Sequence, residues 1–392
     1  MENKTEVYLD HAATTWCSGR VQNVVKKMMD TDFGNPSSMH SKGFEAERHI
    51  RRAAETIAKT LKVSDKEILF TSGGTESNNL ALIGAATANR RLGSRLVTTQ
   101  VEHASVLRTM EYLQEQGFEV VYLPVDRDGI VDLDALREAV DAKTILVSVM
   151  HVNNEVGAIQ PVAHAADIVH EKNPQALFHV DAVQSYGKML LRPKKLGIDL
   201  LSASGHKIHA PKGVGFLYKK EKVKINPIIF GGGQQAGLRS GTYNVPGIAG
   251  IAEAAAQAYE CLDEKVRHMY SLKERLIEKT SCIEGVAANG KCGAESAPHI
   301  VSLSFPGVRS EVLLHALEEY QIYVSAGSAC SSHQSAAHQG ASHTLKAMQL
   351  ERERAESALR FSFCSDTTAE EVDAAADRLQ ELVPRLRRYT RR

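Results

Sequence analysis

The stretch Glu67-Ile-Leu-Phe-Thr-Ser-Gly-Gly-Thr-Glu-Ser-Asn-Asn79 decides the fold class. Its first five residues are typical of a short buried strand, and a helix is predicted from about Thr75, directly after Ser-Gly-Gly. A strand that turns straight into a helix is the repeating unit of an α/β sheet. The free N–H groups at such a helix start favour an anion, although an ordinary capped turn is the alternative. The spacing matches neither a Walker loop nor a dinucleotide fingerprint.

Strand and helix patterns alternate on both sides of this unit. The pattern predicts further strands at 95–99, 119–123, 144–150, 176–180, 200–204 and 215–218, and helices at 39–62, 104–117, 133–140 and 162–172. This alternation predicts a mostly parallel sheet sandwiched by helices.

The pattern changes at about residue 261. A long charged helix is predicted over 262–280, followed by a strand at 299–305, a helix at 310–319, a strand at 321–324 and a last helix that begins at the capping box of Thr368 and Glu371. We therefore expect a large domain of residues 15–260 and a smaller α/β domain formed by residues 1–14 and 261–392.

The composition narrows the class of protein. The chain has 392 residues, of which 43% are hydrophobic and 24% charged, as in ordinary globular proteins. Lys plus Arg and Asp plus Glu both number 47, and this balance argues against direct nucleic-acid binding. No apolar run is long enough to span a membrane. The six cysteines form no Cys-x-x-Cys pair, so we expect reduced thiols and a cytoplasmic location.

Polar residues follow the predicted strands, at the edge where α/β sheets bind their ligands. They are His103, Asn154, Asp181, Gln184, and the group Ser204, His206 and Lys207. Each has an ordinary interpretation alone, as a surface histidine, a helix cap or a solvated lysine. Together with an anion-binding turn, they are the parts that hold pyridoxal phosphate: a lysine for its aldehyde, an aspartate for its ring nitrogen and an imidazole for its ring face.

At this point the chain resembles a known family, the cysteine desulfurases of aminotransferase class V, which are fold-type I pyridoxal-phosphate enzymes. The matching motifs cover nearly the whole chain and occur in the family's order. They are Tyr8 to Thr15, Gly34 to Ser38, Ser72 to Asn79, Val152 to Gly157, His179 to Ser185, Ser204 to Lys207 and Gly231 to Thr242.

The resemblance implies a role for each candidate residue. Gly74 and Thr75, with Ser204 and His206, would hold the phosphate, and His103 would stack on the ring. Asp181 would pair with the ring nitrogen, Gln184 would approach the ring oxygen, and Asn154 would contact that oxygen or the substrate. Lys207 would carry the cofactor and move protons with His103, and Arg360 would bind the substrate carboxylate. Thr242 would reach the phosphate of a second subunit, which implies a homodimer with shared sites.

Cys330 lies in Ser325-Ala-Gly-Ser-Ala-Cys-Ser-Ser332, among small residues that are typical of a loop. It is not part of an apolar pattern, as a buried structural cysteine would normally be. By resemblance to the family's long-loop subgroup, the loop of about 325–343 carries the catalytic cysteine, and Cys330 becomes a persulfide. A metal site built from Cys330, His333, His338 and His343 is the alternative. Their spacing matches no common closed site, so no metal is predicted.

The resemblance therefore implies a cysteine desulfurase that converts L-cysteine to L-alanine. It would pass sulfur to an acceptor protein for iron–sulfur cluster assembly or tRNA thiolation. Gln339 to Lys346 depart from the pattern of the family's housekeeping members, and this leaves the acceptor open. A selenocysteine lyase, another class V aminotransferase-like enzyme and a non-catalytic scaffold for sulfur transfer are the alternatives.

Overall fold

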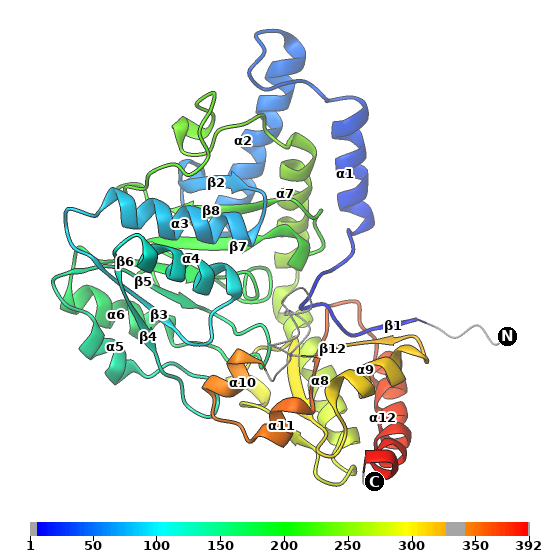
Figure 1. Cartoon of the computed structure of the whole chain (residues 1–392). Helices are drawn as coiled ribbons and strands as arrows, with labels where there is room; N and C mark the ends of the chain where they lie inside the picture. The colour runs from blue at the N-terminus through cyan, green and yellow to red at the C-terminus, as the bar shows by residue number, and fades with distance from the viewer. Residues whose placement is uncertain (1–5, 327–341, 391–392) are drawn as a thin grey trace.

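The computed structural model describes residues 6–326 and 342–390. Its centre is a seven-stranded sheet with the strand order β2-β8-β7-β6-β5-β3-β4 (Figure 1). All neighbouring strands run parallel except β8, which is antiparallel to both β2 and β7. This confirms the predicted mostly parallel sheet. The strands are β2 (Ile68–Thr71), β3 (Arg95–Thr99), β4 (Glu119–Leu123), β5 (Thr144–Met150), β6 (Leu177–Asp181), β7 (Leu200–Ser204) and β8 (Gly215–Lys219).

Helices cover both faces of this sheet, because successive apolar residues of a strand point to opposite sides. In β3, Leu96 packs in one buried cluster with α3 (Gly74–Ala88) and α4 (Ala104–Glu115). Its neighbour Val97 belongs to the cluster on the other face. The helices of that second cluster are α1 (Gly19–Asp30), α2 (Ser41–Leu61), α5 (Leu133–Ala139), α6 (Val162–Lys172) and α7 (Val245–Tyr259).

Two of these helices, α1 and α7, were not predicted. The α7 sequence is apolar almost all round and contains two glycines and a proline near its start, so no 3.6-residue stripe marks it as a helix. Its environment explains this composition, since α7 packs between α1, α2 and the sheet. A helix that is buried on most sides needs no polar face.

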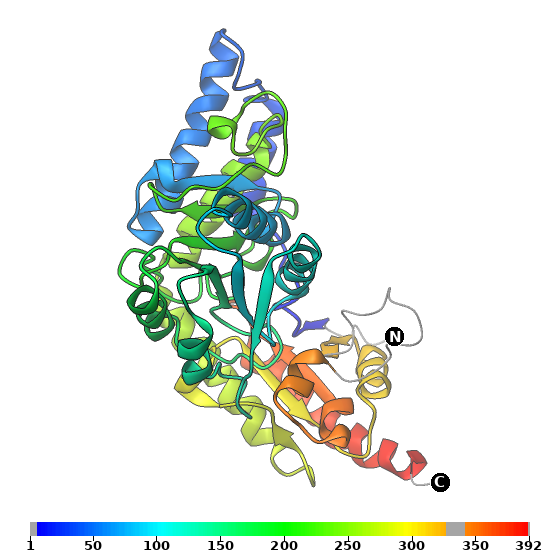
Figure 2. The ribbon, with the colours of Figure 1, turned by 60° about the vertical axis from the view of Figure 1, so that its left-hand side comes forward.

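The residues after α7 build a second unit, which Figure 2 shows in yellow to red at one end of the molecule. Its antiparallel sheet has the order β12-β13-β10-β9, and β1 pairs with β11 in a separate parallel ladder. Its elements are β1 (Val7–Tyr8), α8 (Leu262–Thr280), β9 (Ala287–Ala288), β10 (Ile300–Ser304), α9 (Ser310–Glu318), β11 (Ile322–Tyr323), β12 (Ser325–Ala326), α10 (His343–Ala347), α11 (Arg352–Glu356), β13 (Ala358–Ser362) and α12 (Ala369–Thr390).

This second unit has a hydrophobic core of its own. Its buried residues come from α8, β10, α9, β13 and α12, together with Val7 and Leu9 at the start of the chain. The core of the central sheet draws instead on residues between Val21 and Ala255. On this basis we propose two domains, with boundaries near residues 14 and 260.

Candidate active site

A cavity of about 520 Å³ lies at the carboxyl ends of the central strands. Ten of the residues predicted from the sequence line it: Gly74, Thr75, His103, Asn154, Asp181, Gln184, Ser204, His206, Lys207 and Arg360. Thr242 is exposed and does not line the cavity. Cys330 lies outside the described residues. One cavity therefore brings together predicted residues that are up to 286 positions apart in the chain, from Gly74 to Arg360.

One wall of the cavity is the start of α3, which Gly73 caps without a side-chain hydrogen bond. A Cβ atom at Gly74 would come within 2.7 Å of Val183 Cγ2, so only glycine lets this turn pack so closely against the neighbouring loop. Burial lowers the pKa of His206, also in the cavity lining, to about 4, so its imidazole is neutral near pH 7. A 15-residue helix that begins at a cavity with uncapped N–H groups fits a phosphate group.

Asp181 ends β6 and is buried. Its Oδ2 accepts a 2.7 Å hydrogen bond from Asn78 Nδ2, and its Oδ1 accepts one of 2.9 Å from the Val183 N–H. Within the described part of the chain, no lysine, arginine or histidine forms an ion pair with this carboxylate. A buried carboxylate held only by neutral donors fits a protonated pyridine nitrogen as its counter-charge.

His103 is the N-cap of α4. Its Nδ1 accepts a hydrogen bond of 3.1 Å from the Ser105 N–H and lies 2.8 Å from Ser105 Oγ. Burial lowers its pKa, with Lys207 and His343 adding to that effect and Asp181 opposing it. The ring is therefore neutral near pH 7 with a fixed orientation, and such a ring can stack on a flat ligand and exchange a proton through Nε2.

Lys207 ends a short 3₁₀ turn, Gly205–Lys207, directly after β7. Its Nζ donates hydrogen bonds to the carbonyl oxygens of Ala12, at 2.5 Å, and Ala13, at 2.7 Å. The Thr15 N–H and hydroxyl both donate to the His206 carbonyl at 2.9 Å. The segment after β1 thus fixes the turn that carries Lys207, although it lies almost 200 positions earlier in the sequence.

Arg360 projects from the middle of β13 and is 8% exposed. Its Nη1 donates to the Asn154 carbonyl at 2.8 Å, and its Nη2 forms an ion pair with Asp10 Oδ1 at 2.7 Å. Its buried Nε has no hydrogen-bond partner among the described residues. A guanidinium held on two sides and lining the cavity is a suitable ligand for a carboxylate.

The sequence interpretation missed the residues that hold these groups in place. Asn78 orients Asp181, Ser105 orients His103, and Asp10 orients Arg360. A signal for Asn78 was available, since it lies four residues after Gly74 and a helix brings such positions to the same face. No comparable signal exists for Asp10, which meets Arg360 only through the tertiary fold.

Glu102, beside His103, is fully buried and accepts hydrogen bonds from Thr99 Oγ1 and the Met150 N–H, both at 2.8 Å. Burial raises its pKa from the ordinary 4.5 to about 8. The folded protein therefore binds this proton more tightly than the unfolded chain does. Its contribution to stability is complete below about pH 4.5 and is lost as the pH rises toward about 8.

We expect Glu102→Gln to remove the loss of stability that the wild type shows as the pH rises. The free energy of unfolding of the variant should exceed that of the wild type by a margin that grows from pH 5 to pH 8, reaching about 3 kcal/mol near neutrality. Urea unfolding at several pH values measures it. Glu115→Gln, an exposed position on α4, is the control and should follow the wild type. Parallel curves for Glu102→Gln and the wild type would contradict a buried protonated carboxyl group.

Comparison with known proteins agrees with this geometry. Residues 7–375 match the family model described as aminotransferase class-V, and the chain belongs to that family. The family is a class of pyridoxal-phosphate enzymes, and an uncapped helix start, a buried aspartate and a lysine at one cavity fit that class.

Among curated proteins, the chain is 43% identical to the putative cysteine desulfurase IscS 1 of Bacillus subtilis, over 97% of this chain and 99% of the relative. Among solved structures, a NifS-like protein matches with a TM-score of 0.91 and 42% identity, over 97% of this chain and all of the other. A structure titled SspA in complex with cysteine matches with a TM-score of 0.80 and 32% identity, over 92% of this chain and all of the other.

Proposed function

We propose that the protein is a pyridoxal-phosphate-dependent cysteine desulfurase, which converts L-cysteine to L-alanine and takes up the sulfur as a persulfide on Cys330. One observation carries this proposal: a single cavity contains an anion-binding helix start, Lys207, Asp181, His103 and the carboxylate-binding Arg360. The relatives named cysteine desulfurase match almost the whole chain, and this supports the same activity. The balance is cysteine plus the Cys330 thiol giving alanine plus the Cys330 persulfide.

When bound, pyridoxal phosphate supplies an electron sink that weakens the bonds around the α-carbon of the amino acid. The residues of the chain hold and orient it. Gly74, Thr75, Ser204 and His206 bind the phosphate, Asp181 keeps the ring nitrogen protonated, and Gln184 and Asn154 approach the ring oxygen. His103 lies against the ring, and Lys207 holds the cofactor and transfers protons at the substrate carbons.

The described chain before the Cys330 segment reaches the cavity, and the residues after that segment contact the chain neighbours of cavity residues. Ser325, in β12, lines it directly. On the other side, His343 Nε2 lies 3.0 Å from the Glu102 carbonyl, and Thr344 Oγ1 donates to Glu155 Oε1 at 3.1 Å. Cys330 itself lies outside the described residues, five positions after Ser325 in the sequence. The position of Ser325 at the cavity supports Cys330 as the sulfur acceptor.

The activity is tested by incubating the purified, cofactor-loaded protein with L-cysteine and a reductant. We expect alanine and sulfide in equal amounts. A parallel reaction with L-selenocysteine distinguishes a selenocysteine lyase, which would react with selenocysteine and leave cysteine unchanged. Transfer of the amino group to a keto acid, without sulfide release, would indicate an aminotransferase and overturn the proposal.

Arg360→Lys tests the carboxylate site. Lysine keeps the charge but loses the planar pair of N–H donors, so we expect KM for cysteine to rise about 10- to 100-fold, with a smaller change in kcat. Steady-state sulfide release measures both constants. Arg378→Lys, which changes a half-buried arginine of α12 outside the cavity, should leave them unaltered. An unchanged KM in Arg360→Lys would remove Arg360 from the substrate site.

We also propose a homodimer with shared sites. Large apolar side chains are exposed at Met29, Phe33, Met39 and Phe44, around α1 and α2, and at Phe230. In both views the segment between β8 and α7, which contains Phe230 and Thr242, lies beside α2 (Figures 1 and 2). An exposed apolar surface of this kind is typical of an interface, and Thr242 on it would reach the phosphate of the second subunit. Light scattering during gel filtration tests the dimer.

The sulfur acceptor is proposed to be a protein of iron–sulfur cluster assembly or tRNA thiolation, reached in the cytoplasm. Curated relatives carry the name of the IscS cysteine desulfurases. In the described part of the chain no helix is both long and apolar enough to cross a membrane. Mixing the ³⁵S-persulfide form with candidate acceptors and following the label would identify the one that it serves.

A further inference from the structure

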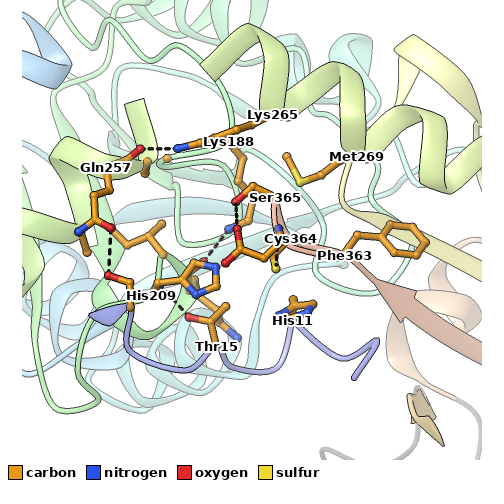
Figure 3. Close-up of a pocket in the computed structure, with 17 residues that line it drawn as sticks. His11, Thr15, Lys188, His209, Gln257, Lys265, Met269, Phe363, Cys364 and Ser365 are labelled. Atoms are coloured by element: carbon orange, nitrogen blue, oxygen red, sulfur yellow. Dashed lines mark hydrogen bonds between the residues drawn. The ribbon is translucent and has the colours of Figure 1, made fainter. Parts of the chain in front are cut away.

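Figure 3 shows a second cavity, of about 150 Å³. Lys207 lines both this cavity and the active-site cavity. Six segments form the second cavity: the stretch after β1, the loop after β6, the turn after β7, α7, α8 and the residues that follow β13. It therefore lies where the two proposed domains meet, and ligand sites occur preferentially at such boundaries. None of the proposed catalytic steps uses this cavity.

Lys188 is the central charged group of the second cavity. It is 7% exposed, and its Nζ donates a 2.9 Å hydrogen bond to the Lys207 carbonyl. An ammonium group has three donors, and no carboxylate of the described residues forms an ion pair with this one. Burial lowers its pKa to about 8, so the charged form still predominates at pH 7. A buried charge without a counter-ion is costly, and an anion in the cavity would offset that cost.

The other lining groups add to this positive character. Lys265 also lines the cavity, and its Nζ donates to the Gln257 carbonyl at 2.5 Å. Burial lowers the pKa of both His11 and His209, so these two imidazoles bring no charge near pH 7. The one carboxylate among the described lining residues is that of Asp366, which is exposed.

The remaining lining is mixed, and its apolar part sets the size and shape of a ligand. Its apolar residues are Ile208, Ala254, Ala258, Met269 and Phe363, and its polar residues are Thr15, Ser18, Gln257 and Ser365. Met269, Ala254 and Ile208 form the apolar part of the lining, and the ring of Phe363 points away from the other labelled residues in Figure 3. An engineered cavity of about 150 Å³ holds a molecule as large as benzene. The space is therefore large enough for an acid of three or four carbons, with one charged end and one apolar end.

We propose that this cavity binds a small aliphatic monocarboxylate, with the carboxylate on Lys188 and the alkyl chain against Met269 and Ala254. An amino acid fits less well, because its ammonium group would enter a space that already contains lysine side chains. The inference does not rest on the proposed function, since binding is measured without cysteine.

Propionate is the probe. The cofactor-loaded protein is titrated with sodium propionate against sodium chloride at constant ionic strength, and saturation-transfer NMR follows the ligand protons. We expect a saturable signal for the wild type that is at least fivefold weaker in Lys188→Met. Lys195→Met, an exposed lysine later in the same loop, is the matched control and should keep the full signal.

Ala254→Leu gives a second test that leaves Lys188 intact. Its larger side chain projects from α7 into the apolar part of the cavity, so the signal should fall as in Lys188→Met. This variant decides the question if Lys188→Met fails to fold. A wild-type signal that does not saturate, or an equal signal in Ala254→Leu, would overturn the proposal. Equal displacement by sulfate and by butyrate would overturn the choice of a carboxylate with an apolar tail.

Discussion

Lys207→Ala is expected to lose the visible absorbance of the bound cofactor and to reduce sulfide release by about a thousandfold or more. The loss has two causes. The alanine has no amine to hold the aldehyde, and it removes the group placed to transfer protons, a role worth about 10²- to 10⁴-fold in rate. Among the described residues that line the active-site cavity, Lys207 is the one lysine, so no other lysine of that lining replaces it. Absorbance spectra and single-turnover alanine formation measure both effects.

Lys212→Ala is the matched control for this experiment. Lys212 is exposed and lies five residues beyond Lys207, so its removal changes the net charge equally without touching the cavity. We expect this variant to keep both the absorbance and the rate. If Lys207→Ala kept both the visible absorbance band of the cofactor-loaded wild type and its turnover, another lysine would hold the cofactor. Lys188 would then be the first lysine to examine.

The parts of the site that the sequence predicted share one property. His103 and Lys207 follow a strand within a few residues and Asp181 ends one, and a parallel sheet collects such positions at one edge. Local sequence is sufficient to predict these three residues, because the strand and the polar residue at its end lie in the same short stretch of the chain. Arg360 required the resemblance to a family, since an arginine within an apolar strand is more often a surface residue.

The parts that the sequence did not predict depend on contacts between distant segments. The carbonyls of Ala12 and Ala13 reach Lys207 only because β1 pairs with β11 and brings the start of the chain to the sheet edge. Helix α7 was missed for a related reason. Its burial, and not its own pattern, makes an apolar sequence with glycines stable as a helix, so the tertiary context outweighs local propensity.

Cys330→Ser is expected to reduce sulfide release by at least about a hundredfold while the cofactor absorbance stays at its wild-type level. A thiol has a pKa near 8.5 and supplies thiolate at neutral pH, whereas a serine hydroxyl does not ionise there and cannot accept sulfur as a persulfide. The two readouts separate this loss from that of Lys207→Ala, in which the absorbance disappears as well. Alkylation with a thiol probe after a single turnover, followed by mass spectrometry, shows which cysteine carries the extra sulfur.

Cys292→Ser controls for the general loss of a thiol, because Cys292 is exposed and lies outside the active-site cavity. It should release sulfide at the wild-type rate and still carry the extra sulfur on Cys330. Label on Cys364 would point to a different route, since this buried thiol lines the smaller cavity and burial raises its pKa. Sulfide release at the wild-type rate from Cys330→Ser would show that the sulfur leaves without any persulfide at this position. The lysine, the aspartate and the cavity would then belong to a pyridoxal-phosphate enzyme with another way of releasing sulfur.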